Sequence, residues 1–220
     1  MITGMEKKRS YTLRKRAESQ DETRQRIVEA TMQLHEELGP RNTTIKAIAE
    51  RAGVQRLTVY RHFPSEVEAF SACTSHWGML NPPPDPSPWG GIADPMLRAV
   101  AALSELYAYF ARTQGMWRVS YRDVGEVPAL QAPMAQFDAY LGMVADSLVA
   151  GFPAAERARV SPTLHHAATY QSWATLDAQG LSDPMKAATV AAWLRGLLAG
   201  APLSGDPMRG TARGAEAKPA

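Results

Sequence analysis

A group of polar and aromatic side chains near the N-terminus has the chemistry needed to bind a nucleic acid. Its members, expected on one exposed face of a short helix, are Arg56, Thr58, Tyr60, Arg61 and His62. Arginine can donate paired hydrogen bonds to guanine or to phosphate oxygens, and hydroxyl and imidazole groups can reach base edges or phosphates as well. The chemistry indicated is therefore noncovalent recognition of a DNA duplex.

Two short helices joined by a glycine turn are predicted over residues 43–63, and they would hold that face in place. The hydroxyl of Thr43 or Thr44 can cap the first helix by accepting a backbone N–H. Its inner face is formed, at helical spacing, by Ile45, Ile48, Ala49 and Ala52. Gly53 can adopt the left-handed conformation that ends a helix. This is a helix-turn-helix whose second helix is built to enter the major groove.

The same residues resemble a known signature. Ile48-Ala49-(two residues)-Ala52-Gly53-Val54, followed by Thr58-Val59-Tyr60-(two residues)-Phe63-Pro64-Ser65, is similar to the DNA-binding motif of the TetR (tetracycline-repressor-like) family. The resemblance covers roughly residues 20 to 78 and is specific because many positions agree at fixed spacing. It implies an all-α protein in which an N-terminal helix-turn-helix DNA-binding domain precedes a larger helical ligand-binding and dimerisation domain. It also implies a transcriptional regulator and not an enzyme.

The residues expected to contact DNA follow from the helix-turn-helix and from this resemblance. Thr44 and Lys46 are expected to bind phosphate, and Arg56, Thr58, Tyr60, Arg61 and His62 to meet the major groove. Leu57 is included as well, either as a contact to a thymine methyl group or as a shield over the turn. Two positions depart from the family pattern. Gln55 stands where a capping serine is usual, and Glu66 stands where the family often has a phosphate-binding lysine, so that contact is not transferred to Glu66.

Charge and composition agree with a DNA-binding first part and exclude several other classes. Residues 1–62 hold 13 lysines and arginines against 8 aspartates and glutamates, whereas residues 63–220 hold 11 against 14. No stretch approaches ~20 uninterrupted apolar residues, so no membrane partner is expected. The single cysteine, Cys73, excludes an intrachain disulfide and fits a reducing cytoplasm, the expected location.

Four segments are predicted along the chain. Residues 1–18 are expected to be a basic disordered arm, and residues 19–65 the helix-turn-helix domain, with its first helix starting near Ser19–Thr23. Residues 66–200 are expected to form the helical effector-binding and dimerisation domain, and residues 201–220 a disordered tail.

The last helices of the second domain predict self-association. Helices are expected from Pro128 to Ala150, from Ser161-Pro162 to Ala178, and from Ser182 to Leu198. Apolar residues cover almost the whole circumference of the last one, so it must be buried on two sides. A homodimer through the last two helices is the simplest answer, and it agrees with how family members dimerise. Two-fold symmetry would then match a palindromic operator in double-stranded DNA.

Motifs for enzymatic or metal chemistry are absent from the sequence. It contains no GxxxxGK[ST], GxSxG, HExxH or paired CxxC, and the adjacent His165 and His166 cannot readily share one metal. No catalytic residue, cofactor or metal ion is therefore expected.

Aromatic and methionine side chains of the second domain could line a cavity for a small molecule. Packing in the core is the alternative for each of them. The residues predicted to bind a ligand are Trp77, Tyr107, Phe110, Met116, Trp117, Tyr121, Tyr140, Met143, Tyr170 and Trp173.

The sequence thus favours a repressor released from its operator by a small apolar or aromatic effector whose identity is unknown. Two alternatives stay open: a DNA-binding regulator that needs no ligand, and an enzyme acting on a small molecule in the second domain. A filled aromatic core would favour the first, and converging titratable groups in a pocket would favour the second.

Overall fold

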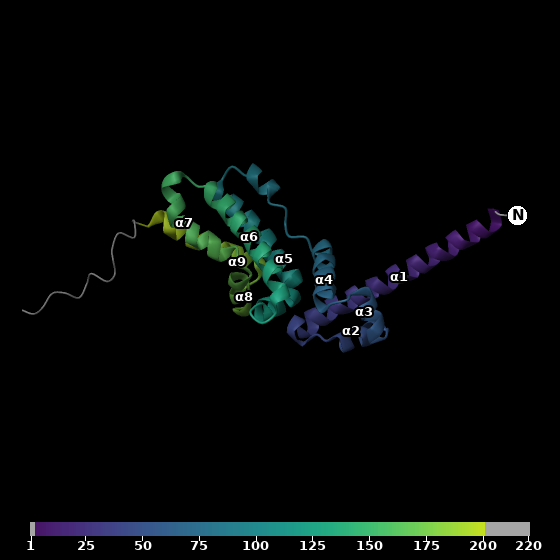
Figure 1. Ribbon diagram of the computed structural model, residues 1–220. Coiled ribbons are helices and arrows are strands. Elements are labelled where there is room, and N and C mark those ends of the chain that lie inside the picture. The colour runs from purple at the N-terminus through teal and green to yellow at the C-terminus, as the bar shows by residue number, and fades with distance from the viewer. Residues whose placement is uncertain (1–2, 201–220) are drawn as a thin grey trace, which may run out of the picture.

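The chain is helical throughout the part that the computed structural model describes, which is residues 3–200 and, for side chains, Lys15 and residues 17–200. No strand occurs in this range, so the all-α prediction is confirmed for it (Figure 1). The helices are α1 (Thr3–Leu38), η1 (Pro40–Asn42), α2 (Ile45–Ala52), α3 (Arg56–His62), α4 (Glu66–Leu80), η2 (Ser87–Gly91), α5 (Pro95–Asp123), α6 (Pro128–Ala150), α7 (Ala154–Ala167), α8 (Tyr170–Ala178) and α9 (Asp183–Ala199).

The N-terminal head consists of α1, α2, α3 and the first turns of α4. The Thr44 hydroxyl caps α2 by accepting the Ala47 N–H at 3.2 Å, and Gly53 ends α2 with a φ of 66°. Both features are those predicted from the sequence. The buried head core is formed by Ile27, Val28, Ala30, Leu34, Ile45, Ile48, Ala49, Ala52, Val59, Phe63 and Ala69.

The C-terminal body is a helical bundle of α5 to α9. In α6, which has the predicted bounds, the expected apolar stripe is buried: Leu130, Met134, Phe137, Leu141, Val144 and Leu148. Helix α5 packs against α9 and α6, and α6 packs against α7. Apolar side chains at intervals of three and four hold these faces together by removing their surface from water.

Helix α4 joins the two parts because it contributes to both cores. Ala69 is buried in the head core, while its neighbour Phe70 is buried in the body core. Helix α1 also reaches the body: a Cβ at Gly115 of α5 would lie 2.5 Å from the Glu36 carboxylate. The absence of a side chain at Gly115 therefore permits this close approach between α1 and α5.

The structure differs from the sequence-based expectation at the N-terminus. Helix α1 starts at Thr3, so residues 3–18 are helical where a disordered arm was expected, and Ser19 and Thr23 lie inside the helix (Figure 1). The Thr23 hydroxyl donates to the Ser19 carbonyl at 2.8 Å instead of marking a helix start. Residues 5–38 contain neither glycine nor proline, so nothing local interrupts the helix. The tail expected at 201–220 lies outside the described residues.

The helices near the C-terminus also differ from the expected bounds. The helix predicted from Ser161 to Ala178 is two helices, and Pro162 lies inside α7 and not at its start. Thr169 leaves the helical conformation and caps α8 by accepting the Ser172 N–H at 3.2 Å. None of the helices in the described range is long and apolar enough to span a bilayer.

Candidate nucleic-acid interface and internal cavity

Helix α3 presents to solvent most of the side chains that were predicted to meet DNA. Arg56, Tyr60 and Arg61 are exposed, and Leu57 is the most exposed large apolar residue of this helix, at 76%. Thr58 and His62 are half-buried at the edges of the same surface. The opposite side is fixed by Val59, which is completely buried. An anchored helix with a polar outer face can enter the major groove without rearrangement.

Few intramolecular contacts occupy these side chains. The Arg61 guanidinium donates to the Thr58 hydroxyl at 3.5 Å, which is a weak contact. Burial, assisted by the positive charges of Arg61 and Arg24, lowers the pKa of His62. The His62 ring is therefore uncharged at neutral pH and can both donate and accept hydrogen bonds. The Arg24 guanidinium carbon lies 4.8 Å from the centroid of the Phe63 ring, and this cation–π contact stabilises the end of α3.

The expected phosphate-binding residues lie at the start of α2. Thr44 and Lys46 are both exposed there, and the Lys46 ammonium is 3.8 Å from the Glu50 carboxylate. Because backbone N–H groups at a helix N-terminus attract anions, Thr44 and Lys46 are in a suitable place to contact a phosphate.

The two departures from the family pattern are visible in the geometry. Gln55 precedes α3 without making a side-chain cap. Glu66 is exposed in the first turn of α4, where Ser65 caps the helix by accepting the Glu68 N–H at 3.2 Å.

A cavity of about 500 Å³, partly open to solvent, lies between α1, α4, α5 and α6. Its lining is mainly aromatic and apolar, with a few polar side chains. The lining residues are His35, Pro40, Phe70, Cys73, Thr74, Ser75, Trp77, Gly78, Asn81, Pro83, Tyr109, Met116, Trp117, Ser120, Leu130, Pro133, Met134, Gln136, Phe137 and Tyr140. A cavity of this size and lining can hold a small organic molecule.

Comparison with known proteins assigns the head to a family. Residues 27–72 match the sequence model of the family described as bacterial regulatory proteins, tetR family. The head is therefore a TetR-family DNA-binding domain.

Two relatives from Pseudomonas putida share the head region with this chain. They are the HTH-type transcriptional regulator SrpR and the uncharacterized HTH-type transcriptional regulator TtgW. Each is 41% identical over 59 residues, which is 27% of this chain. The match spans 28% of SrpR and 44% of TtgW, so it covers less than half of either relative.

Solved structures share the fold over most of the chain. A TetR-like transcriptional regulator from Rhodococcus sp. RHA1 has a TM-score of 0.61 at 18% identity, covering 81% of this chain and 97% of the other. A second transcriptional regulator from Rhodococcus has a TM-score of 0.55 at 17% identity, covering 80% and 95%. These likenesses show that the body, as well as the head, has the fold of TetR-like proteins.

The cavity is lined by four of the ten residues predicted to bind a ligand. They are Trp77, Met116, Trp117 and Tyr140. The other six lie elsewhere: Tyr107, Phe110, Tyr121, Met143, Tyr170 and Trp173.

These six are placed by contacts of their own. The Tyr107 hydroxyl donates to the Ala167 carbonyl at 3.0 Å, and the Trp173 N–H donates to Asp183 at 3.2 Å, which fixes both in the core. Phe110 is completely buried, and Tyr121 stacks on Tyr170 with ring centroids 5.4 Å apart. Met143 is 53% exposed on the surface of α6.

Other cavity residues were not identified from the sequence. Tyr109 and Phe70 follow the same helical spacing as the core, so periodicity could have shown that they are buried but not that they face a void. His35 and Cys73 gave no local signal, because they meet only when α1 packs on α4.

His35 and Cys73 form an uncharged pair at the head side of the cavity. The Cys73 sulfur lies 3.6 Å from His35 Nδ1. Burial lowers the pKa of His35 to about 4, against a smaller opposing effect of Asp123, and burial raises the pKa of Cys73 to about 12. Both groups are therefore neutral at pH 7. Across the described residues, no group of three or more His, Cys, Asp or Glu side chains could hold a metal ion.

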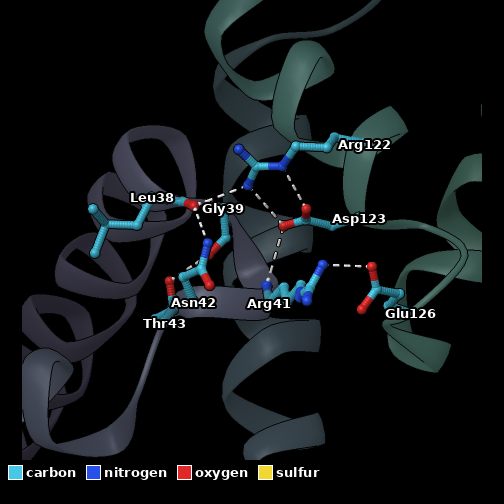
Figure 2. Close-up of polar contacts among 8 residues, drawn as sticks. All are labelled: Leu38, Gly39, Arg41, Asn42, Thr43, Arg122, Asp123 and Glu126. Carbon is cyan, nitrogen blue, oxygen red and sulfur yellow. Dashed lines mark hydrogen bonds and ion pairs between the residues drawn. The ribbon is translucent and has the colours of Figure 1, made fainter.

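A polar junction connects the head to the body of the protein (Figure 2). Arg122 of α5 donates to the Leu38 carbonyl at the end of α1 at 2.9 Å and to both oxygens of Asp123. Asp123, which is 1% exposed, also accepts the Arg41 backbone N–H at 3.2 Å. The hydrogen bond from Arg122 lowers the pKa of the Asp123 carboxyl, although burial opposes this. Asp123 is therefore a buried carboxylate that holds the α1–α2 connection against α5.

Proposed function

We propose that this TetR-family protein is a sequence-specific repressor that binds a palindromic operator as a homodimer and leaves it when a small molecule binds. The observation that carries the proposal is the α3 surface, where Arg56, Tyr60 and Arg61 are exposed and Val59 anchors the helix. The positive charge of residues 1–62 supports binding to a polyanion.

The exposed apolar surface of α9 supports dimerisation through α8 and α9. One side of α9 packs into the body through Val190, Ala191 and Leu194. On the remaining surface Met185 is 58% exposed and Trp193 is 43% exposed. Large apolar side chains on a helix surface favour contact with a partner, and a second copy would bury them symmetrically. Such a dimer would place the two α3 helices about one DNA turn, ~34 Å, apart or at a multiple of it.

The position of the cavity supports release by a ligand. Helix α4, which lines the cavity, also carries Ala69 into the head core, and α1 contributes His35 to the lining. A molecule that binds better to a conformation with differently spaced heads lowers the affinity for DNA by that difference in binding free energy.

The two alternative functions lack the features that would favour them. A ligand-independent regulator was expected to have a filled aromatic core, but a cavity of about 500 Å³ is open between α1, α4, α5 and α6. An enzyme would need ionisable groups in the cavity that are ready to transfer a proton or attack a substrate. No Asp, Glu, Lys or Arg is among the described lining residues, and burial makes His35 a weak base and keeps the Cys73 thiol protonated.

Selection of bound sequences from a random DNA pool tests the proposal. We expect the full-length chain to enrich a palindrome whose half-sites are one or more helical turns apart, and a compound screen to find molecules that release it. Failure to enrich any sequence, or enrichment of a single asymmetric half-site, would contradict the proposed function. Enrichment of a palindrome with no releasing compound would instead favour the ligand-independent regulator.

A further inference from the structure

The cavity walls are flat aromatic faces and edges. The Trp117 ring stacks on Phe137, with centroids 3.9 Å apart and planes at 17°. Trp77 meets Trp117 edge-on at 5.2 Å and 88°, and Tyr140 stacks beside Phe137 at 6.0 Å. Aromatic rings prefer offset stacking and edge-to-face contacts with other rings, so these walls favour a planar aromatic molecule over a branched aliphatic one.

The described lining offers no counter-charge to an ionic ligand. Its polar members are His35, Cys73 and hydroxyl and amide side chains, and none is a carboxylate, ammonium or guanidinium. An ion that enters such a site loses part of its hydration without compensation, which costs more than burying a neutral polar group. The cavity therefore discriminates against both carboxylates and ammonium ions.

Trp117, one of the residues that line the cavity, has a buried donor without a hydrogen-bond partner in the described part of the chain. Trp117 is only 6% exposed, and its indole N–H is unsatisfied. The Tyr109 phenol lies near this N–H without the distance and angle of a hydrogen bond, and its own hydroxyl is directed to the Asn81 carbonyl at 3.4 Å. The Tyr140 hydroxyl is likewise engaged, donating to the Pro84 carbonyl at 2.6 Å. Because an indole N–H can only donate, a ligand satisfies it only with an acceptor atom.

We propose that the cavity binds a neutral, planar aromatic molecule with a hydrogen-bond acceptor, and that the Trp117 indole N–H donates to this acceptor. The inference rests on the proposed function, because it defines the chemistry of the molecule that would release the operator. It goes beyond the proposed function by disfavouring ions, by favouring a ligand with an acceptor, and by assigning recognition of that acceptor to one side chain.

Three matched probes test this chemistry with the full-length chain and without DNA. Fluorenone is neutral, planar and tricyclic with one ketone oxygen; fluorene has the same rings without the ketone; a fluorenone carboxylate carries a negative charge. Equilibrium dialysis would give the dissociation constant of each. We expect fluorenone and fluorene to bind and the carboxylate to bind at least tenfold more weakly than fluorenone. No binding of fluorenone, or equal binding of the carboxylate, would overturn the inference.

The Trp117→Phe variant isolates the hydrogen bond while it keeps an aromatic ring in the wall. We expect the ratio of fluorenone to fluorene affinity to fall by about three- to tenfold in this variant, because the ketone loses its donor. The different water solubilities of the two probes cancel when this ratio is compared between chains. Trp89→Phe is the matched control, since the Trp89 N–H is also buried and unpaired but does not line the cavity. An unchanged ratio in Trp117→Phe, or an equal change in Trp89→Phe, would refute the assignment.

A measurement on the unmodified chain covers the case in which Trp117→Phe disturbs the fold. In an NMR titration, fluorenone is expected to move the Trp117 indole N–H resonance downfield, and fluorene is not. If both probes shift it alike, the hydrogen bond is absent and the inference fails. Neither experiment involves DNA, so a chain that selects a palindrome but fails these tests would keep its proposed function and lose only this ligand class.

Discussion

At the scale of single residues, Arg61 is the α3 side chain best suited to read a base. It is exposed, and its contact with Thr58 at 3.5 Å is weak enough to be exchanged for a guanine. Arg61→Ala is expected to reduce operator affinity by about 1–3 kcal/mol and to relax specificity at one base pair. Fluorescence anisotropy with a set of single-base-pair variants of the selected operator would measure both effects.

A matched arginine provides the control for that prediction. Arg51 is also in the head, but its guanidinium is paired with the Glu37 carboxylate at 2.8 Å. Arg51→Ala should leave the specificity profile unchanged. If Arg61→Ala weakens binding to every sequence equally, Arg61 contacts phosphate and does not read a base.

The buried imidazole of His35 makes stability depend on pH. Burial lowers its pKa from 6.5 in the unfolded chain to about 4 in the folded one, so the unfolded state takes up a proton first. The free energy of unfolding is therefore expected to fall as the pH drops from 6.5 to 4, by up to about 3 kcal/mol from this group. Urea denaturation across this range would measure the slope. His35→Gln should remove this contribution to the pH dependence of the free energy of unfolding. If the slope of the variant equals that of the original chain, His35 is protonated in the folded state over this range.

At the scale of elements, Gly39 determines how closely α1 approaches α5. Its φ of 89° is a conformation that residues with a side chain rarely adopt, and a Cβ there would collide with Arg122 Nη2 and Asp123 Oδ2. Gly180 is a matched control, with a φ of 76° and no atom near its Cβ position. Gly39→Ala is expected to lower the free energy of unfolding by about 1–3 kcal/mol more than Gly180→Ala, because it also displaces the Arg122–Asp123 pair. Equal losses in urea denaturation would mean that this pair can move aside without cost.

The elements that the sequence predicted well are those specified by local contacts. The start of α2 depends on the Thr44 cap and its end on Gly53, and both signals lie within the helix they define. At residues 3–18 and at Thr169 the local signals conflicted. Ser19 and Glu22 indicated a helix start, but the helix-forming residues before them extend α1 back to Thr3. The apolar spacing predicted one helix across Thr169, but the Thr169 cap starts a new helix there.

The cavity could be predicted as a class of site but not residue by residue. Tyr107 and Tyr109 are two residues apart in α5, and both are buried. Tyr109 lines the cavity, whereas Tyr107 donates to the Ala167 carbonyl of α7. Which of two buried aromatics faces a void depends on how four helices pack, and helical periodicity reports only burial.

At the scale of the whole molecule, head and body are connected at two places: the residues between the two cavities and the Arg122–Asp123 junction. Phe70, His35 and Pro40 separate the large cavity from a smaller one of about 260 Å³ between the head and the start of α6. The Arg122–Asp123 junction holds the α1–α2 connection against α5 (Figure 2). A ligand that moves Phe70 or His35 would therefore shift the head about the junction, and small displacements in a packed interface can change the spacing of two heads.

In the proposed mechanism, self-association converts such a shift into a change of DNA affinity, so it is the property that this mechanism most needs. Trp193→Glu places a charge on the exposed side of α9, where the native ring is 43% exposed, and is expected to yield a monomer. With one head per molecule, affinity for the palindrome should fall by about a hundredfold or more, because the second half-site no longer adds to the first. Light scattering after size exclusion and anisotropy with whole and half operators would measure the two effects. Met79→Glu, at a site 74% exposed on α4, is the matched control and should stay dimeric. A Trp193→Glu variant that remains a dimer and binds the whole operator tightly would place the subunit interface on another surface.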